Sequence, residues 1–146
     1  MLPDGWTEDY DSDDEAVYRH TDGREQNEHP GRLEGVIALT DAIKNNGALT
    51  SINVLKNKIP VEQAQALVEI MRSKDLLTTL CGLSGKEIEL DWSNQGLGAG
   101  DAVLIANDIK THLALSSVNM LNNGIGVEQA NVLVDIMKSK SKDNGR

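Results

Sequence analysis

Three acidic residues at alternate positions, Asp9, Asp11 and Asp13, form the first pattern in the chain that could do chemistry. Alternate carboxylates open the loops that bind calcium, because this hard cation takes several oxygen ligands. Such a loop also needs a glycine at its sixth position and a glutamate at its twelfth. Here these positions hold Asp14 and His20. We therefore expect a solvated acidic loop and no calcium site.

The glycines Gly96, Gly98 and Gly100 have a spacing found in loops that hold phosphate groups. The dinucleotide-binding pattern needs its third glycine at position 101, which is Asp101 in this chain. We interpret the glycines as turn residues and expect no nucleotide site.

The residues suited to metal binding or nucleophilic catalysis are few. His20, His29 and His112 do not have the spacing of metal ligands, and Cys81 is the single cysteine. One thiol excludes an intrachain disulfide and a cysteine-rich metal site. No motif brings a nucleophile, a base and an acid together. We expect no enzyme activity, no metal and no other cofactor.

The negative charge is concentrated at the N-terminus. The net charge is -9, and residues 1–30 hold ten acidic residues against two basic ones. Such a segment repels phosphate backbones, so we expect no nucleic-acid partner. The sequence shows no signal peptide and no apolar run of about 18 residues, so we expect no membrane partner. With a single cysteine, these features indicate a soluble cytoplasmic chain.

An internal repeat organises the rest of the chain. Residues 49–74 match residues 115–140 at an offset of 66, and sixteen of the 26 aligned residues are identical. In each copy, alternating apolar residues predict a short strand. An asparagine follows, Asn57 or Asn123, and apolar residues at helical spacing then predict an amphipathic helix.

Further units lie around these copies. The three apolar residues of a third strand and turn match the first copy at an offset of 38: Leu90, Trp92 and Leu97. A helix through Ile105 and Ile109 follows them. A partial unit begins at Leu77 without a helix of its own, and residues 33–45 predict a helix before the first strand.

The shared pattern, L-x-x-L-x-L-x-x-N-x-L, resembles the leucine-rich repeat of the ribonuclease-inhibitor-like type. The resemblance covers about residues 33–140. It implies an α/β fold: a short horseshoe with parallel strands on its concave face and helices on its convex face. We place this domain at residues 32–146. Because each unit buries its face on the next, we expect an uncapped C-terminal edge that would permit self-association.

The acidic segment, residues 1–31, resembles a degenerate WW domain. Leu2-Pro3-x-Gly5-Trp6 opens it and Glu28-His29-Pro30 closes it. The resemblance implies a small β structure with three residues packed together: Trp6, Val17 and Pro30.

The peptide-binding groove of that family depends on a second Trp and a Tyr. This chain has Asn27 and Ala16 at those positions, so only Tyr18 and His20 remain for a groove. Three interpretations stay open: a cap on the first repeat, a disordered segment, or residual binding of proline-rich peptides.

In a leucine-rich-repeat horseshoe, the residues between the inward leucines lie on the concave face, where partners usually bind. The resemblance places ten residues there: Ser51, Asn53, Leu55, Thr79, Cys81, Asp91, Ser93, Ser117, Asn119 and Leu121. Leu55 and Leu121 would form an exposed apolar pair, which suits protein recognition. The alternative is that both leucines pack under a flanking loop or under the N-terminal segment.

We therefore expect a non-catalytic module that binds a protein partner on the concave face. One alternative is a regulatory subunit that inhibits or activates an enzyme such as a nuclease or a small GTPase. An inhibitor would need several acids on this face, and a GTPase activator an Arg, whereas only Asp91 is present. Another alternative is a piece of a longer repeat scaffold.

Overall fold

The structure is a computed structural model. It describes residues 2–10, 16–26 and 30–143, with only the backbone described at residues 25–26, 30–33 and 143. The chain divides into two compact units, Met1–Ala42 and Ile43–Arg146. The expected boundary after Gly31 differs from this division, which falls within helix α1 (Pro30–Asn45). Proline suits the first position of a helix, so α1 continues through the expected boundary.

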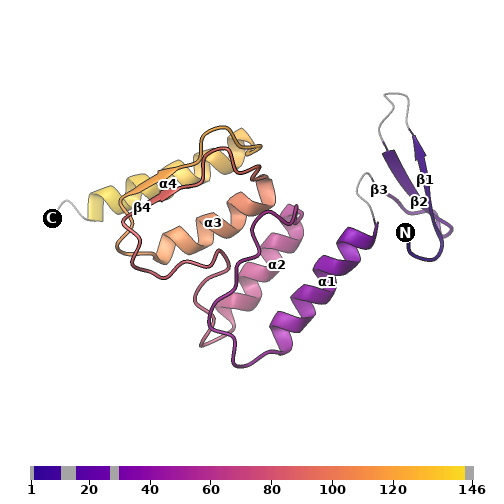
Figure 1. Ribbon diagram of the computed structural model, residues 1–146, viewed down its shortest axis with the longest axis horizontal. Coiled ribbons are helices and arrows are strands. Elements are labelled where there is room, and N and C mark those ends of the chain that lie inside the picture. Colours follow the sequence, from indigo (N-terminus) through magenta and orange to yellow (C-terminus); the bar gives the residue numbers. More distant parts are fainter. Residues whose placement is uncertain (1, 11–15, 27–29, 144–146) are drawn as a thin grey trace. The chain divides into compact units, whose positions relative to one another are not determined.

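The first unit contains a three-stranded antiparallel sheet followed by α1 (Figure 1). The small β structure expected at the N-terminus is therefore present. Its strands, in the order β1-β2-β3, are β1 (Trp6–Tyr10), β2 (Ala16–His20) and β3 (Glu25–Gln26). Gly23, with a φ of 95°, lies in the turn between β2 and β3 and supplies the left-handed backbone found there.

The strand register corrects one expectation for this sheet. Trp6 pairs with His20, and Val17 pairs with Asp9. Opposed residues share a face and neighbouring residues alternate, so Trp6 and Val17 lie on opposite faces. Trp6 instead contacts the His20 ring, with centroids 5.1 Å apart. The prediction that Trp6 packs with Val17 is therefore wrong, and the side chain of Pro30 lies outside the described part.

The second unit alternates short strands with helices, so the mixed α/β class is confirmed. Residues 50–54 bond to residues 78–82, for example from Val54 N–H to the Leu80 carbonyl at 3.0 Å. Helices α2 and α3 pack together, as do α3 and α4 (Figure 1). The elements are α2 (Val61–Arg72), β4 (Glu89–Asp91), α3 (Ala99–Thr111), β5 (Ser117–Asn119) and α4 (Val127–Asp143), with β4 and β5 parallel.

The core of this unit consists of the apolar positions that recur in the repeats. Ala64, Leu67 and Val68 on α2 are buried, as the helical spacing predicts. Helix α3 is buried along most of its length because α2 packs against one side of it and α4 against another. The largest fully buried side chains are Val54, Leu67, Leu80, Leu97, Leu104, Ile105, Ile109 and Leu115.

The N-terminus of α3 fits closely against Ile59 of the first repeat copy. A Cβ atom at Gly100 would lie 1.8 Å from the carbonyl oxygen of Ile59, so only glycine allows this approach. The adjacent Asp101 is buried and accepts hydrogen bonds from the N–H groups of Gly98 and Lys56, each at 3.0 Å. Gly100 therefore serves helix packing, whereas Gly96, with a φ of 68°, is a turn residue.

Candidate functional site: the strand face

The same turn ends the strand in three of the repeat units. In each, the side-chain oxygen of Asn or Asp accepts a hydrogen bond from the N–H two residues later. The donor and acceptor residues are Leu55 with Asn53 (3.1 Å), Ser93 with Asp91 (2.9 Å) and Leu121 with Asn119 (3.2 Å). The next residue has a positive φ in all three: Lys56, Asn94 and Asn122. Leu55, Ser93 and Leu121 therefore occupy equivalent positions.

The repeat asparagine Asn123 fixes the last of these turns to the unit before it. Its amide nitrogen donates to the carbonyls of Met120 and Trp92, at 2.9 and 2.8 Å. Its amide oxygen accepts from the N–H groups of Gln95 and Leu97, both at 3.0 Å. Asn57 donates to the Val54 carbonyl in the same way. The asparagines of the sequence pattern thus hold backbone groups where the chain leaves each strand.

Eight of the ten residues expected on the binding face are at least partly accessible. The most exposed apolar side chain among them is Leu121, at 71%. We call the eight the strand face: Ser51, Asn53, Leu55, Asp91, Ser93, Ser117, Asn119 and Leu121. Leu55, Ser93 and Asn119 are half-buried and the other five are exposed.

The expected exposure of Thr79 and Cys81 is wrong, because both residues are buried. The cause is Asp108, a buried carboxylate on α3. Its Oδ2 accepts hydrogen bonds from the Thr79 hydroxyl at 2.6 Å and from the N–H groups of Leu80 and Cys81, each at 2.9 Å. This carboxylate draws residues 79–81 against α3 and removes them from the surface.

Asp91 carries the only ionisable side chain of the strand face. It accepts hydrogen bonds from the Ser93 hydroxyl at 2.6 Å and from the Ser93 N–H at 2.9 Å. These bonds favour the charged carboxylate and hold the pKa of Asp91 below its ordinary value. The strand face therefore presents one fixed negative charge among amides, hydroxyls and two leucines.

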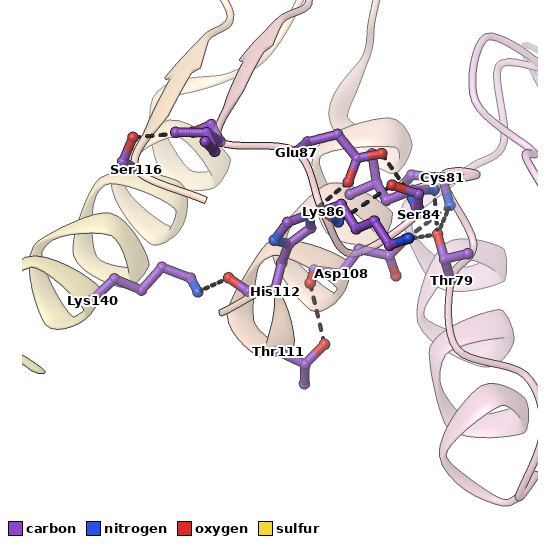
Figure 2. Close-up of polar contacts among 12 residues, drawn as sticks. Thr79, Cys81, Ser84, Lys86, Glu87, Asp108, Thr111, His112, Ser116 and Lys140 are labelled. Carbon is purple, nitrogen blue, oxygen red and sulfur yellow. Dashed lines mark hydrogen bonds and ion pairs between the residues drawn. The ribbon is translucent and has the colours of Figure 1, made fainter. Parts of the chain in front are cut away.

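A second group of residues has the types used in nucleophilic catalysis: Cys81, Asp108, His112 and Glu87. Figure 2 shows the His112 imidazole turned toward Glu87, with Nε2 and Oε2 2.8 Å apart. The His112 Nδ1 atom is buried, with no hydrogen-bond partner among the described residues. Burial, followed by the charge of Asp108, raises the pKa of the Cys81 thiol.

The contacts of this cluster bind the loop after residues 78–82 to the end of α3. Glu87 accepts a hydrogen bond from the Ser84 N–H at 2.8 Å, in addition to its bond with His112. The His112 bond and then the Ser84 bond lower the pKa of Glu87. Lys140 on α4 donates to the His112 carbonyl. No sequence pattern predicted this pairing, because Glu87 lies in the loop after residues 78–82 and His112, 25 residues later, lies at the end of α3.

Tyr18 and His20, the two residues that the sequence analysis expected to remain of a groove, lie on β2 in the first unit. Tyr18 and His20 alternate along β2 and so share a face, which is also the face of Trp6. The guanidinium carbon of Arg24 lies 5.4 Å from the centre of the Trp6 ring, in the geometry of a cation–π contact. This ring is therefore already covered in part by side chains of its own sheet.

The acidic pattern at Asp9, Asp11 and Asp13 is only partly visible. Asp9 forms an ion pair with Arg19, whereas Asp11, Asp13 and Asp14 lie outside the described residues. In the part of the chain that the structure describes, no three His, Cys, Asp or Glu side chains are grouped as metal ligands. None of the described helices is long and apolar enough to cross a membrane. Neither a protein-family model nor a curated protein matches this sequence.

Proposed function

We propose that this chain is a non-catalytic interaction module of the leucine-rich-repeat type, and that it binds a protein partner through the strand face. The observation that carries the proposal is Leu121. This side chain is 71% exposed and sits on a turn that is hydrogen-bonded on both sides. A large apolar side chain held in water by a fixed backbone gains free energy when a partner covers it.

The rigidity of the turns favours binding. Asn119 holds the Leu121 N–H, and Asn123 ties the Leu121 carbonyl and the preceding unit together. Ordering a loop on binding costs free energy, whereas a turn that is already ordered avoids much of that cost. Leu121 is thus presented as a pre-organised anchor.

The chemistry around Leu121 defines the kind of partner. Asp91 offers a carboxylate held in its charged form, and Ser117 and Asn119 offer hydroxyl and amide groups. A complementary protein surface would place an apolar pocket over Leu121 and a cationic or N–H donor group near Asp91.

The contacts of the Cys81 cluster support a role without catalysis. A cysteine nucleophile must reach the thiolate state, and burial beside the charge of Asp108 opposes that ionisation. Asp108 is engaged by the Thr79 hydroxyl and two backbone N–H groups, and Glu87 is engaged by His112. These groups are committed to holding the fold.

We also propose that the parallel pairing of β4 with β5 and the adjacent helices α2, α3 and α4 form a short horseshoe. In this arrangement the strand face is the concave surface. The first unit would be a WW-like accessory sheet whose groove is reduced to Tyr18 and His20. The shared turns at Asn53, Asp91 and Asn119 support the repeat assignment.

The experiment is a quantitative pull-down from lysate of the source cells with the intact chain and two variants. Leu121→Asp places a charge at the proposed anchor, and Leu113→Asp is the matched control. Leu113 is 86% exposed and lies between α3 and β5, outside the strand face. We expect Leu121→Asp to weaken the binding of a specific partner at least 10-fold, which is about 1.4 kcal/mol of binding free energy. We expect Leu113→Asp to bind the same partner as well as the intact chain does. Equal capture by both variants would show that the partner does not bind at the strand face.

A further inference from the structure

The outer side of the last repeat unit is open. A pocket of about 870 Å³ lies between β5 and α4, and its lining includes Met120, Ile125, Val134 and Met137. Val134 is 48% exposed, whereas its equivalent in the first copy, Val68, is 6% exposed. Apolar side chains that the first copy buries are thus left in contact with solvent in the second copy.

In the first copy the equivalent side is covered by the next unit of the chain. Helix α2 packs on α3, and a groove beside them, which α4 also lines, has five residues on the α2 side: Val61, Gln65, Val68, Glu69 and Arg72. On the α3 side the groove is lined by Ala102, Val103, Ala106, Asn107 and Lys110. Small alanines let the two helices approach closely.

The five α2 positions keep their chemical type in α4. The equivalents are Val127, Asn131, Val134, Asp135 and Lys138, which repeat the order valine, amide, valine, acid and base. Ten of the 26 aligned residues differ between the copies, yet this surface is preserved in kind. Gln65, Glu69 and Arg72 are exposed, and so are their equivalents in α4. The two valines differ between the copies: Val61 is half-buried and Val68 is buried, whereas Val127 is 78% and Val134 is 48% exposed. The valines that are covered on α2 are therefore uncovered on α4.

Among the described residues, the backbone N–H groups at the free edge of β5 also lack the acceptors that the equivalent groups have in the first copy. In the first copy, Val54 donates to the Leu80 carbonyl and Lys56 donates to Asp101 of the next unit. The equivalents are Met120 and Asn122. β5 bonds to β4 through alternate residues, such as Asn119, so the Met120 N–H points away from β4. Among the described residues, the Asn122 N–H has no acceptor.

We propose that the open side of β5 and α4 docks a strand–helix unit of the kind formed by residues 77–112. The strand of that unit would accept hydrogen bonds from the edge of β5. Its helix would begin with a glycine, because the Ile125 carbonyl is equivalent to the Ile59 carbonyl against which Gly100 packs. An acid next to that glycine would accept from Asn122, as Asp101 accepts from Lys56.

A second copy of the chain fits this surface less well. Its own unit at residues 77–112 is already enclosed between α2 and α4. The side it has free is the same β5 and α4 side, which would have to meet its counterpart in the antiparallel sense. In that pairing the valines of α4 would face valines of the other copy, whereas the valines of α2 face alanines of α3. The pairing would also provide no acid at the start of a helix to accept a hydrogen bond from the Asn122 N–H.

The test extends the chain at Lys140 with an appended probe unit. Residues 75–112 are appended after Lys140, which is equivalent to Lys74, so the native junction between units is reproduced. The tether supplies a high local concentration of the probe. We expect amide hydrogen exchange, followed by NMR, to slow by at least about 10-fold at Met120 and Asn122. Unchanged exchange at these amides would overturn the proposal.

Two valines of α4 provide the matched variants of the extended chain. Val134→Asp lies on the open side and is expected to abolish the added protection. Val132→Asp is the control, because Val132 is 49% exposed but lines the groove toward α3. A valine at the position of Gly100 in the appended unit should also abolish protection. Protection that survives Val134→Asp would contradict the assignment of the surface.

Light scattering of the unextended chain tests whether a second copy of the chain occupies the open side of β5 and α4. A monomer over the micromolar range agrees with the proposal. A dimer that Val134→Asp dissociates would overturn it in favour of a second copy. The inference is separate from the strand-face proposal, although three strand-face residues, Ser117, Asn119 and Leu121, also line this pocket. Loss of a partner from Leu121→Asp with retention by Val134→Asp identifies the strand face.

Discussion

Leu55 and Leu121 lie 66 residues apart and donate their N–H groups to equivalent asparagines, Asn53 and Asn119, at 3.1 and 3.2 Å. They nevertheless differ in exposure: Leu55 is half-buried, whereas Leu121 is 71% exposed. A further strand follows Leu55 within the repeat array, while Leu121 stands on the last unit. The equivalent turns thus place one leucine in a half-buried position and the other in an exposed position.

This difference predicts unequal costs of substitution. Leu121→Asp should change the free energy of unfolding by less than about 0.5 kcal/mol, because the side chain is mostly in water. Leu55→Asp should lower it by about 1–3 kcal/mol, because a charge would enter a half-buried site. Urea unfolding followed by circular dichroism measures both changes. Equal costs would show that Leu121 is packed in solution.

Asp108 is expected to be among the most sensitive polar positions. Asp108→Ala would leave the Leu80 and Cys81 N–H groups and the Thr79 hydroxyl without their acceptor in a buried site. Because each unsatisfied buried donor costs about 1–3 kcal/mol, the free energy of unfolding should fall by about 3 kcal/mol or more. The measurement is urea unfolding at pH 7. Asp135→Ala, at an exposed acid of α4, is the control and should cost less than about 0.5 kcal/mol.

The sequence pattern predicted the apolar framework well. Alternation at Ile52 and Val54 and helical spacing at Ala64, Leu67 and Val68 reflect burial against neighbouring units, which periodicity reports directly. Buried polar groups follow no such period. Asp108 would be assigned to an exposed face by its charge alone, so the burial of Thr79 and Cys81 could not be anticipated.

The strand register of the first sheet could not be predicted from the sequence, for a different reason. A shift of one residue in strand pairing moves every side chain to the other face. Apolar alternation within β2 does not by itself constrain that register. Trp6 consequently lies opposite His20 and away from Val17.

The Glu87 and His112 pair should make stability depend on pH. The pKa of Glu87 is lowered in the folded chain, whereas the unfolded chain has the ordinary value near 4.5. The unfolded state therefore binds more protons below pH 4.5, and the stability contributed by this carboxylate is lost as pH falls. Glu87→Gln should cost about 1 kcal/mol at pH 7 and less at pH 3. An equal cost at both pH values would contradict the lowered pKa.

The buried thiol gives a chemical probe of the fold. Because burial raises the pKa of Cys81, very little thiolate exists at pH 8 in the folded chain. Reaction with a disulfide reagent such as DTNB should be slower by at least about 100-fold in the native chain than in concentrated urea. Thr79→Val, which removes a hydroxyl that binds Asp108, should raise the native rate. Similar rates with and without urea would show that Cys81 is accessible.

The most direct test of the strand-face account is hydrogen–deuterium exchange of the intact chain with and without the captured partner. The account predicts slower exchange in the peptides that contain residues 51–55, 89–93 and 117–121, with little change around Leu113 and in residues 6–20. Protection confined to residues 6–20, or to the groove between α2 and α3, would contradict it and assign binding to another surface.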